Sequence, residues 1–168
     1  MKFHFGSPTA ILITTIFLFG CEKDKFSGVK VDQDLILELK SQSVSSININ
    51  SQNYFIDAYL WRDFQPNSPP NGKPLISINW LISSDSRPIP DNIVMKQQYV
   101  IYRDSVWIAN YENETGPSTP DYKIEKISRN GPKWGPKVYV DVVAKISNTK
   151  TNQDYYLKLE NVFIIRTD

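Results

Sequence analysis

The sequence predicts an all-β fold, an antiparallel β-sandwich that occupies residues 34–168 of the 168-residue chain. Three observations carry this prediction. Apolar and polar residues alternate with period two over long stretches, and no window keeps an apolar stripe at helical spacing. Turn-forming residues recur between the alternating segments, which gives roughly seven to nine short strands.

The first predicted strands lie before a long proline-rich loop. Residues 35–40 alternate between apolar and polar positions and predict the first strand, and residues 47–49 predict a second. Residues 54–61 form a longer alternating segment. The following stretch, residues 63–74, holds several prolines and a glycine, so we expect a loop there.

Residues 75–82 predict a half-buried strand after this loop. Its even-numbered residues, Ile76, Ile78, Trp80 and Ile82, are large and apolar, whereas the other face carries Ser77, Asn79 and Leu81. We therefore expect Trp80 and the three isoleucines to face the core.

A tight hairpin and a turn-rich region follow. Residues 99–102 and 106–111 alternate on either side of a three-residue turn, which predicts the hairpin. Residues 112–136 hold three Gly-Pro steps, and only residues 122–127 within them predict a short strand.

The last two predicted strands form the most regular part of the chain. In residues 138–146 the even-numbered positions are all apolar and indicate a buried face. Residues 155–159 begin the final strand, which continues over residues 162–166. We expect a β-bulge at Asn161, which interrupts its alternation.

This number of strands in about 135 residues is similar to an immunoglobulin or fibronectin type III domain. The resemblance implies an immunoglobulin-like domain of two packed sheets. The alternative is a closed barrel of the lipocalin type, which the turn-rich residues 112–136 disfavour because they break regular up-and-down spacing. Sandwiches host many unrelated functions, so the fold class alone selects none of them.

The N-terminal residues have the features of an export signal. Lys2 provides a basic start, residues 10–19 form an apolar run, and Leu18-Phe19-Gly20-Cys21 surrounds the only cysteine. This segment resembles a bacterial lipoprotein signal, which implies that residues 1–20 are removed and that Cys21 carries acyl chains such as palmitate. A transmembrane anchor would need about twenty apolar residues. The other alternative is ordinary cleavage that leaves Cys21 as a free thiol.

The resemblance also implies where the protein is located. Residues 21–33 begin with polar and charged side chains and are expected to form a lipidated tether. In enteric bacteria an aspartate after the acylated cysteine is associated with retention at the inner membrane. Glu22 stands at that position here, which implies attachment to the outer membrane through the acyl anchor.

The same cleavage would remove much of the chain's catalytic chemistry. His4 is the only histidine and lies within residues 1–20, while acylation would consume the only thiol. The mature chain could then build neither a Ser-His-Asp nor a Cys-His site, nor a zinc site of imidazole and thiolate. We therefore expect no enzyme, metal site or cofactor, although carboxylate pairs or a Ser-Lys dyad need neither residue.

Charge excludes a further class of partner. Loss of Lys2 leaves eighteen basic residues against eighteen acidic ones, with no basic run. Nucleic-acid binding depends on clustered lysine and arginine, so we expect no nucleic-acid partner.

Aromatic residues provide the remaining candidates for binding. Trp134 lies between two Gly-Pro steps and could contact a protein or stack on a sugar, or it could fold back and close one end of the sandwich. Trp61 and Tyr59 share one face of a predicted strand, where the alternatives are a ligand contact and ordinary packing within the sheet. We predict a non-enzymatic envelope lipoprotein that binds a protein or supports envelope assembly, with a surface glycan-binding accessory as the alternative.

Overall fold

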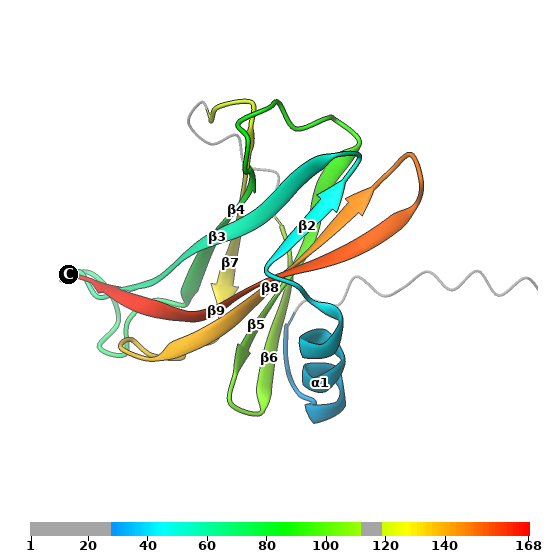
Figure 1. Ribbon diagram of the computed structural model, residues 1–168. Helices are drawn as coiled ribbons and strands as arrows, with labels where there is room; N and C mark the ends of the chain where they lie inside the picture. Colours follow the sequence, from blue (N-terminus) through cyan, green and yellow to red (C-terminus); the bar gives the residue numbers. More distant parts are fainter. Residues whose placement is uncertain (1–27, 112–118) are drawn as a thin grey trace, which may run out of the picture.

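The computed structural model describes residues 28–111 and 119–168, and it confirms the predicted all-β class. Its strands form one curled, mixed sheet shaped as a half-barrel, and a single described helix packs against the outside (Figure 1). The predicted signal peptide, Cys21 and the tether as far as residue 27 lie outside the described residues.

The helix is α1 (Gln33–Gln42), and the strands in chain order are β1 (Gly28–Val31), β2 (Ser46–Ile49), β3 (Gln52–Asp63), β4 (Leu75–Ser83), β5 (Ile93–Tyr102), β6 (Ser105–Asn110), β7 (Lys123–Gly131), β8 (Tyr139–Asn148) and β9 (Gln153–Thr167). The order across the sheet is β1-β6-β5-β8-β9-β3-β4-β7, and β2 pairs with β3. One half of the curl consists of β1, β6, β5, β8 and β9, and the other half consists of β2, β3, β4 and β7.

The two halves are joined by a parallel pair of strands. The end of β9 runs beside β3, with Leu60 opposite Ile164 and Trp61 opposite Ile165. The prediction of a purely antiparallel sheet is wrong at this pair. β9 is fifteen residues long, so it first pairs antiparallel with β8 and then continues past the end of that pairing to reach β3.

The predicted strand over residues 35–40 is wrong, because these residues belong to α1. The Asp32 carboxylate accepts a hydrogen bond from the Leu35 amide at 2.9 Å and so caps the helix. Ile36 and Leu39, three residues apart, are buried, whereas Leu37 is exposed. The apolar residues in this segment satisfy both periods, and the cap favours the helix.

The folded domain begins before residue 34, where the sequence placed its start. Residues 28–31, assigned to the tether, form β1 and pair with β6, with Gly28 opposite Ile108. The next residue, Asp32, caps α1. Residues 28–33, nearly half of the expected tether, are therefore part of the domain.

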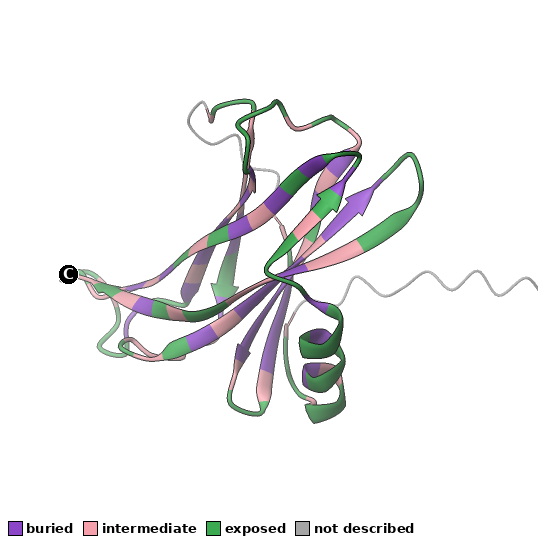
Figure 2. Ribbon diagram, viewed as in Figure 1, coloured by how far each residue is buried: buried purple, intermediate pink, exposed green. Residues whose placement is uncertain are grey.

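Two hydrophobic cores stabilise the fold on opposite sides of the sheet. Figure 2 marks the buried residues along the strands and the helix. The larger fills the inside of the curl, where Leu60, Val100 and Leu157 are fully buried and Trp107 is almost so. The smaller lies under α1 on the outside. The helix covers only the half of the outer face built by β5, β6, β8 and β9.

Most of the other predicted elements are confirmed. β5 and β6 form the expected hairpin around Arg103 and Asp104, and β7 is a longer version of the strand expected over residues 122–127. β8 buries its predicted apolar face. Asn161 has a φ of 59° at the expected bulge, where the pairing of β8 with β9 shifts register.

The predicted orientation of β4 is wrong. Leu75, Asn79 and Leu81 face the inner core, while Trp80 lies on the outer face and is only partly buried. The inner position of Asn79 is stabilised across the curl, because its amide donates a 2.5 Å hydrogen bond to the Gln98 side chain. A buried polar pair can thus replace an apolar contact, and it leaves the larger apolar residues of β4 outside.

Candidate functional site

Large apolar side chains gather on the half of the outer sheet face that α1 does not cover. We call this surface the outer aromatic face. It consists of Phe55, Tyr59 and Trp61 of β3, Ile76, Ile78, Trp80 and Ile82 of β4, Tyr139 of β8, and Phe163 and Ile165 of β9.

Strand register places these side chains in continuous rows. Tyr59 pairs with Ile78, Trp61 pairs with Ile76 on one side and Ile165 on the other, and Tyr139 pairs with Phe163. Residues paired in this way point to the same side of a sheet. The rows partly shield one another, yet Tyr139 remains 62% exposed and Phe163 40% exposed.

The structure brings together Trp61 and Tyr59, two of the predicted site residues. Their ring centroids are 5.3 Å apart and the ring planes are inclined by 39°. Tilted aromatic pairs of this kind are favourable contacts. Because the rings are not coplanar, they form an uneven surface and not a flat platform.

Trp80 is held in a fixed orientation at the other end of the face. Its indole N–H donates a 2.6 Å hydrogen bond to the Glu125 carboxylate, and the Lys123 ammonium lies 4.4 Å from the ring centroid. Both partners come from β7, next to β4. A fixed ring loses little conformational entropy when a partner binds.

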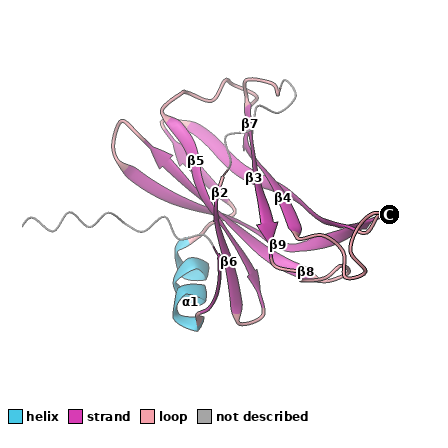
Figure 3. Cartoon of the chain, turned by 180° about the vertical axis from the view of Figure 1, so that it is seen from behind, coloured by secondary structure: helices cyan, strands magenta, loops and turns pink. Residues whose placement is uncertain are grey.

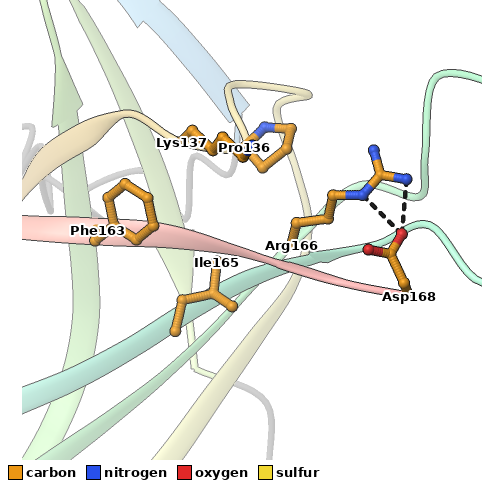
Figure 4. Close-up of a pocket in the computed structure, with 6 residues that line it drawn as sticks. All are labelled: Pro136, Lys137, Phe163, Ile165, Arg166 and Asp168. Atoms are coloured by element: carbon orange, nitrogen blue, oxygen red, sulfur yellow. Dashed lines mark hydrogen bonds and ion pairs between the residues drawn. The ribbon is translucent and has the colours of Figure 1, made fainter.

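A groove of about 720 Å³ adjoins the face at the end of β9 (Figure 4). Phe163 and Ile165 belong to both features, and Pro136 and Lys137 lie opposite them across the groove. The C-terminal end of β9 lies on the side of the molecule away from α1 (Figures 1 and 3).

The far end of the groove carries a close ion pair. The Arg166 guanidinium donates hydrogen bonds to the Asp168 carboxylate at 2.7 and 2.6 Å and lies 4.2 Å from the centroid of the Phe64 ring. The hydrogen bond from Arg166 lowers the pKa of Asp168. The groove thus joins an apolar floor to charged groups at its rim, a common combination at sites that recognise ligands.

Trp134, the third predicted site residue, lies apart from the outer aromatic face. It packs against the inner core, with its ring 5.5 Å from that of Tyr102. This placement matches the alternative in which Trp134 folds back to close one end of the domain.

The sequence did not reveal most of the outer aromatic face. Trp80 and the isoleucines of β4 were expected inside, because period two alone does not say which face of a strand is buried. Tyr139 could have been found, since it alternates with the buried residues Val140 and Val142.

No arrangement within residues 28–111 and 119–168 resembles a metal centre, since no group of three or more potential ligand side chains converges there. The described part of the chain also holds no helix long and apolar enough to span a bilayer.

Comparisons with known proteins add no functional information. No protein family model, curated protein or solved structure matches this chain.

Proposed function

We propose that the protein is a non-enzymatic lipoprotein of the cell envelope that binds another protein through the outer aromatic face. The single observation that carries this proposal is the aromatic and isoleucine surface on the uncovered half of the sheet, in which Tyr59, Tyr139 and Phe163 are exposed and the isoleucines are partly buried. Extended apolar surfaces on water-exposed domains commonly mark interaction sites, and tryptophan and tyrosine dominate the binding energy of protein interfaces.

The composition of the face favours a protein partner over a glycan. Ile76 and Ile78 lie directly beside Trp61 and Tyr59, and aliphatic side chains offer a sugar no hydrogen bonds. The neighbouring groove, with Phe163 and Ile165 on its floor, could receive one apolar side chain of the partner.

The lipid anchor and the immunoglobulin-like character of the domain belong to the same proposal. Two sheet halves enclose a common core, as two sheets do in a sandwich, although β9 runs through both halves here. Acylated Cys21 would stand seven residues before Gly28, so it would hold the domain within about 25 Å of the membrane surface.

Site-specific photo-crosslinking in the cells that naturally make the protein tests the proposal. A photoreactive amino acid would replace Tyr59 in one variant and Tyr139 in another. Because both side chains lie on the outer aromatic face, we expect the same discrete crosslinked partner from both positions. Adding Trp61→Ser should weaken the crosslink by about tenfold or more, as expected for an interface tryptophan.

Leu37 provides the matched control, since it is an exposed apolar residue on α1, away from the face. A photoreactive group there should give no crosslink to the same partner. Equal crosslinking from Leu37 and Tyr59, or none from Tyr59 and Tyr139, would contradict the proposal.

A glycan is the second candidate ligand, supported by the neighbouring rings of Trp61 and Tyr59 with Asp57 on the same strand face. Titration with a broad panel of oligosaccharides should change tryptophan fluorescence if a sugar stacks there. A response that disappears in Trp61→Ser but persists in Trp134→Phe would support the glycan over the protein partner.

A further inference from the structure

A second hollow lies on the inner side of the curled sheet. This inner pocket has a volume of about 540 Å³ and lies beside residues 84–92, the connection from β4 to β5. Ile93 and Met95 of β5 and Ile124 of β7 line it, and all three side chains also contact the inner core. Its volume falls within the range of small-molecule sites.

One residue that lines the inner pocket carries a hydrogen-bond donor without a partner. Tyr111 follows β6 and lines the pocket, and its hydroxyl oxygen is buried without a hydrogen bond. Burial raises the pKa of this hydroxyl, which keeps it protonated and able to donate. Buried polar groups are usually satisfied, so the unpaired hydroxyl of this lining residue points to a missing acceptor.

Positive charge also lines this pocket. Lys126 pairs in register with the inward-facing Asn79, so its side chain belongs to the inner side of β7. Lys96 stands where β5 shifts register and lines the pocket too. No described residue forms an ion pair with either lysine, and Asp91 is the only acidic residue among the described lining residues. The lining therefore favours an anion.

We propose that the inner pocket binds an aliphatic carboxylate, a fatty-acid-like molecule with one negative charge. Its chain would pack against Ile93, Met95 and Ile124, while its carboxylate would accept a hydrogen bond from Tyr111 and pair with Lys126. The pocket and the outer aromatic face lie on opposite sides of β4 and β7. The inference is therefore independent of the proposed function.

Calorimetric titration with dodecanoate, below its micelle-forming concentration, tests the inference on residues 22–168. This version retains every described element and both cores. We expect saturable binding of one dodecanoate per chain. Lys126→Met should weaken binding about tenfold because it removes the ion pair, and Tyr111→Phe about fivefold because it removes one hydrogen bond.

Two controls separate this site from unspecific adsorption. Lys123→Met changes a lysine of the same strand that faces Trp80 on the outer side, so it should leave the affinity unchanged. Dodecyltrimethylammonium has the same chain length with the opposite charge, and it should bind the unmodified protein at least about tenfold more weakly.

Three outcomes would overturn the inference: no saturable binding of dodecanoate, equal binding of the cationic ligand, or unchanged affinity in a folded Lys126→Met variant. The comparison of the two ligands uses the unmodified sequence of residues 22–168. This comparison therefore tests the inference even if a substitution prevents folding.

Discussion

Arg62 shows how one residue can organise two loops. Its side chain is buried to 1% exposure, and its guanidinium donates to the backbone carbonyls of Lys73, Lys133 and Gly135 at 2.7 to 3.1 Å. It also donates to the carbonyl of Asn71. Burial lowers the pKa of Arg62, since the charged form loses water. These hydrogen bonds join the loop after β3 to the segment before β8.

We expect Arg62→Met to destabilise the protein by about 3 kcal/mol, because four backbone carbonyls lose a charged donor. Arg87→Met is the matched control, since Arg87 is half exposed and its ion pair with Asp85 lies at the surface. That change should cost about 1 kcal/mol or less. Urea unfolding measures both values, and equal losses would contradict the role assigned to Arg62.

Tyr99 makes the stability of the protein depend on pH in the alkaline range. Burial under α1 raises the pKa of its hydroxyl to about 12 from an ordinary value of 10.0, and the hydroxyl donates to Gln97 at 2.6 Å. The folded state thus favours the neutral side chain. The contribution of neutral Tyr99 to the free energy of unfolding is complete below pH 10. It falls as the pH rises towards 12, because the tyrosine of the unfolded chain ionises first.

Tyr99→Phe should therefore reduce the loss of stability between about pH 10 and 12. The free energy of unfolding, measured in urea at several values in this interval, would show a shallower decline than in the unmodified protein. Identical slopes for the two proteins would contradict the assignment.

At the scale of elements, α1 depends on a cap that the alternating pattern concealed. Asp32→Ala removes the side chain that accepts from the Leu35 amide, and it should destabilise the protein by about 1 kcal/mol. Asp34→Ala is the control, because Asp34 lies in the first turn and contributes only through the helix dipole. Thermal unfolding monitored by circular dichroism compares the two, and a larger loss from Asp34→Ala would contradict this account.

The sequence correctly predicted those strands whose alternation allowed only one of the two faces to be the buried one. β8 has valine, alanine and isoleucine at one set of positions and mostly polar residues at the other, so both its existence and its orientation followed. β4 has apolar residues on both faces, and its buried face carries Asn79, whose partner Gln98 lies nineteen positions away in the chain. Trp61 and Tyr59 could be predicted as neighbours, but their membership of the ten-residue outer aromatic face depended on the pairing of β3 with β4 and β9.

At the scale of the whole molecule, the proposed anchor would set the orientation of the domain. β1 and α1 follow the tether directly, and the groove at the end of β9 lies on the other side (Figures 1 and 3). An anchor at Cys21 would therefore hold the groove away from the membrane, where a partner protein could reach it.

Metabolic labelling with palmitate tests the anchor itself. We expect label in the unmodified protein and none in Cys21→Ala, because Cys21 is the only thiol in the chain. Glu22→Ala, which changes the adjacent residue, should retain the label. Label that persists in Cys21→Ala would contradict the lipoprotein assignment.

The parallel pairing of β3 with β9 also affects when the protein can fold. Leu60 is paired with Ile164, so the two halves of the sheet join only after nearly the whole chain is available. Contacts between such distant residues form slowly, since a long loop must close first. A chain that crosses a membrane through a narrow channel must remain unfolded until it has passed. If the protein is exported in this way, the late pairing of β9 with β3 would keep the chain unfolded until β9 has left the channel.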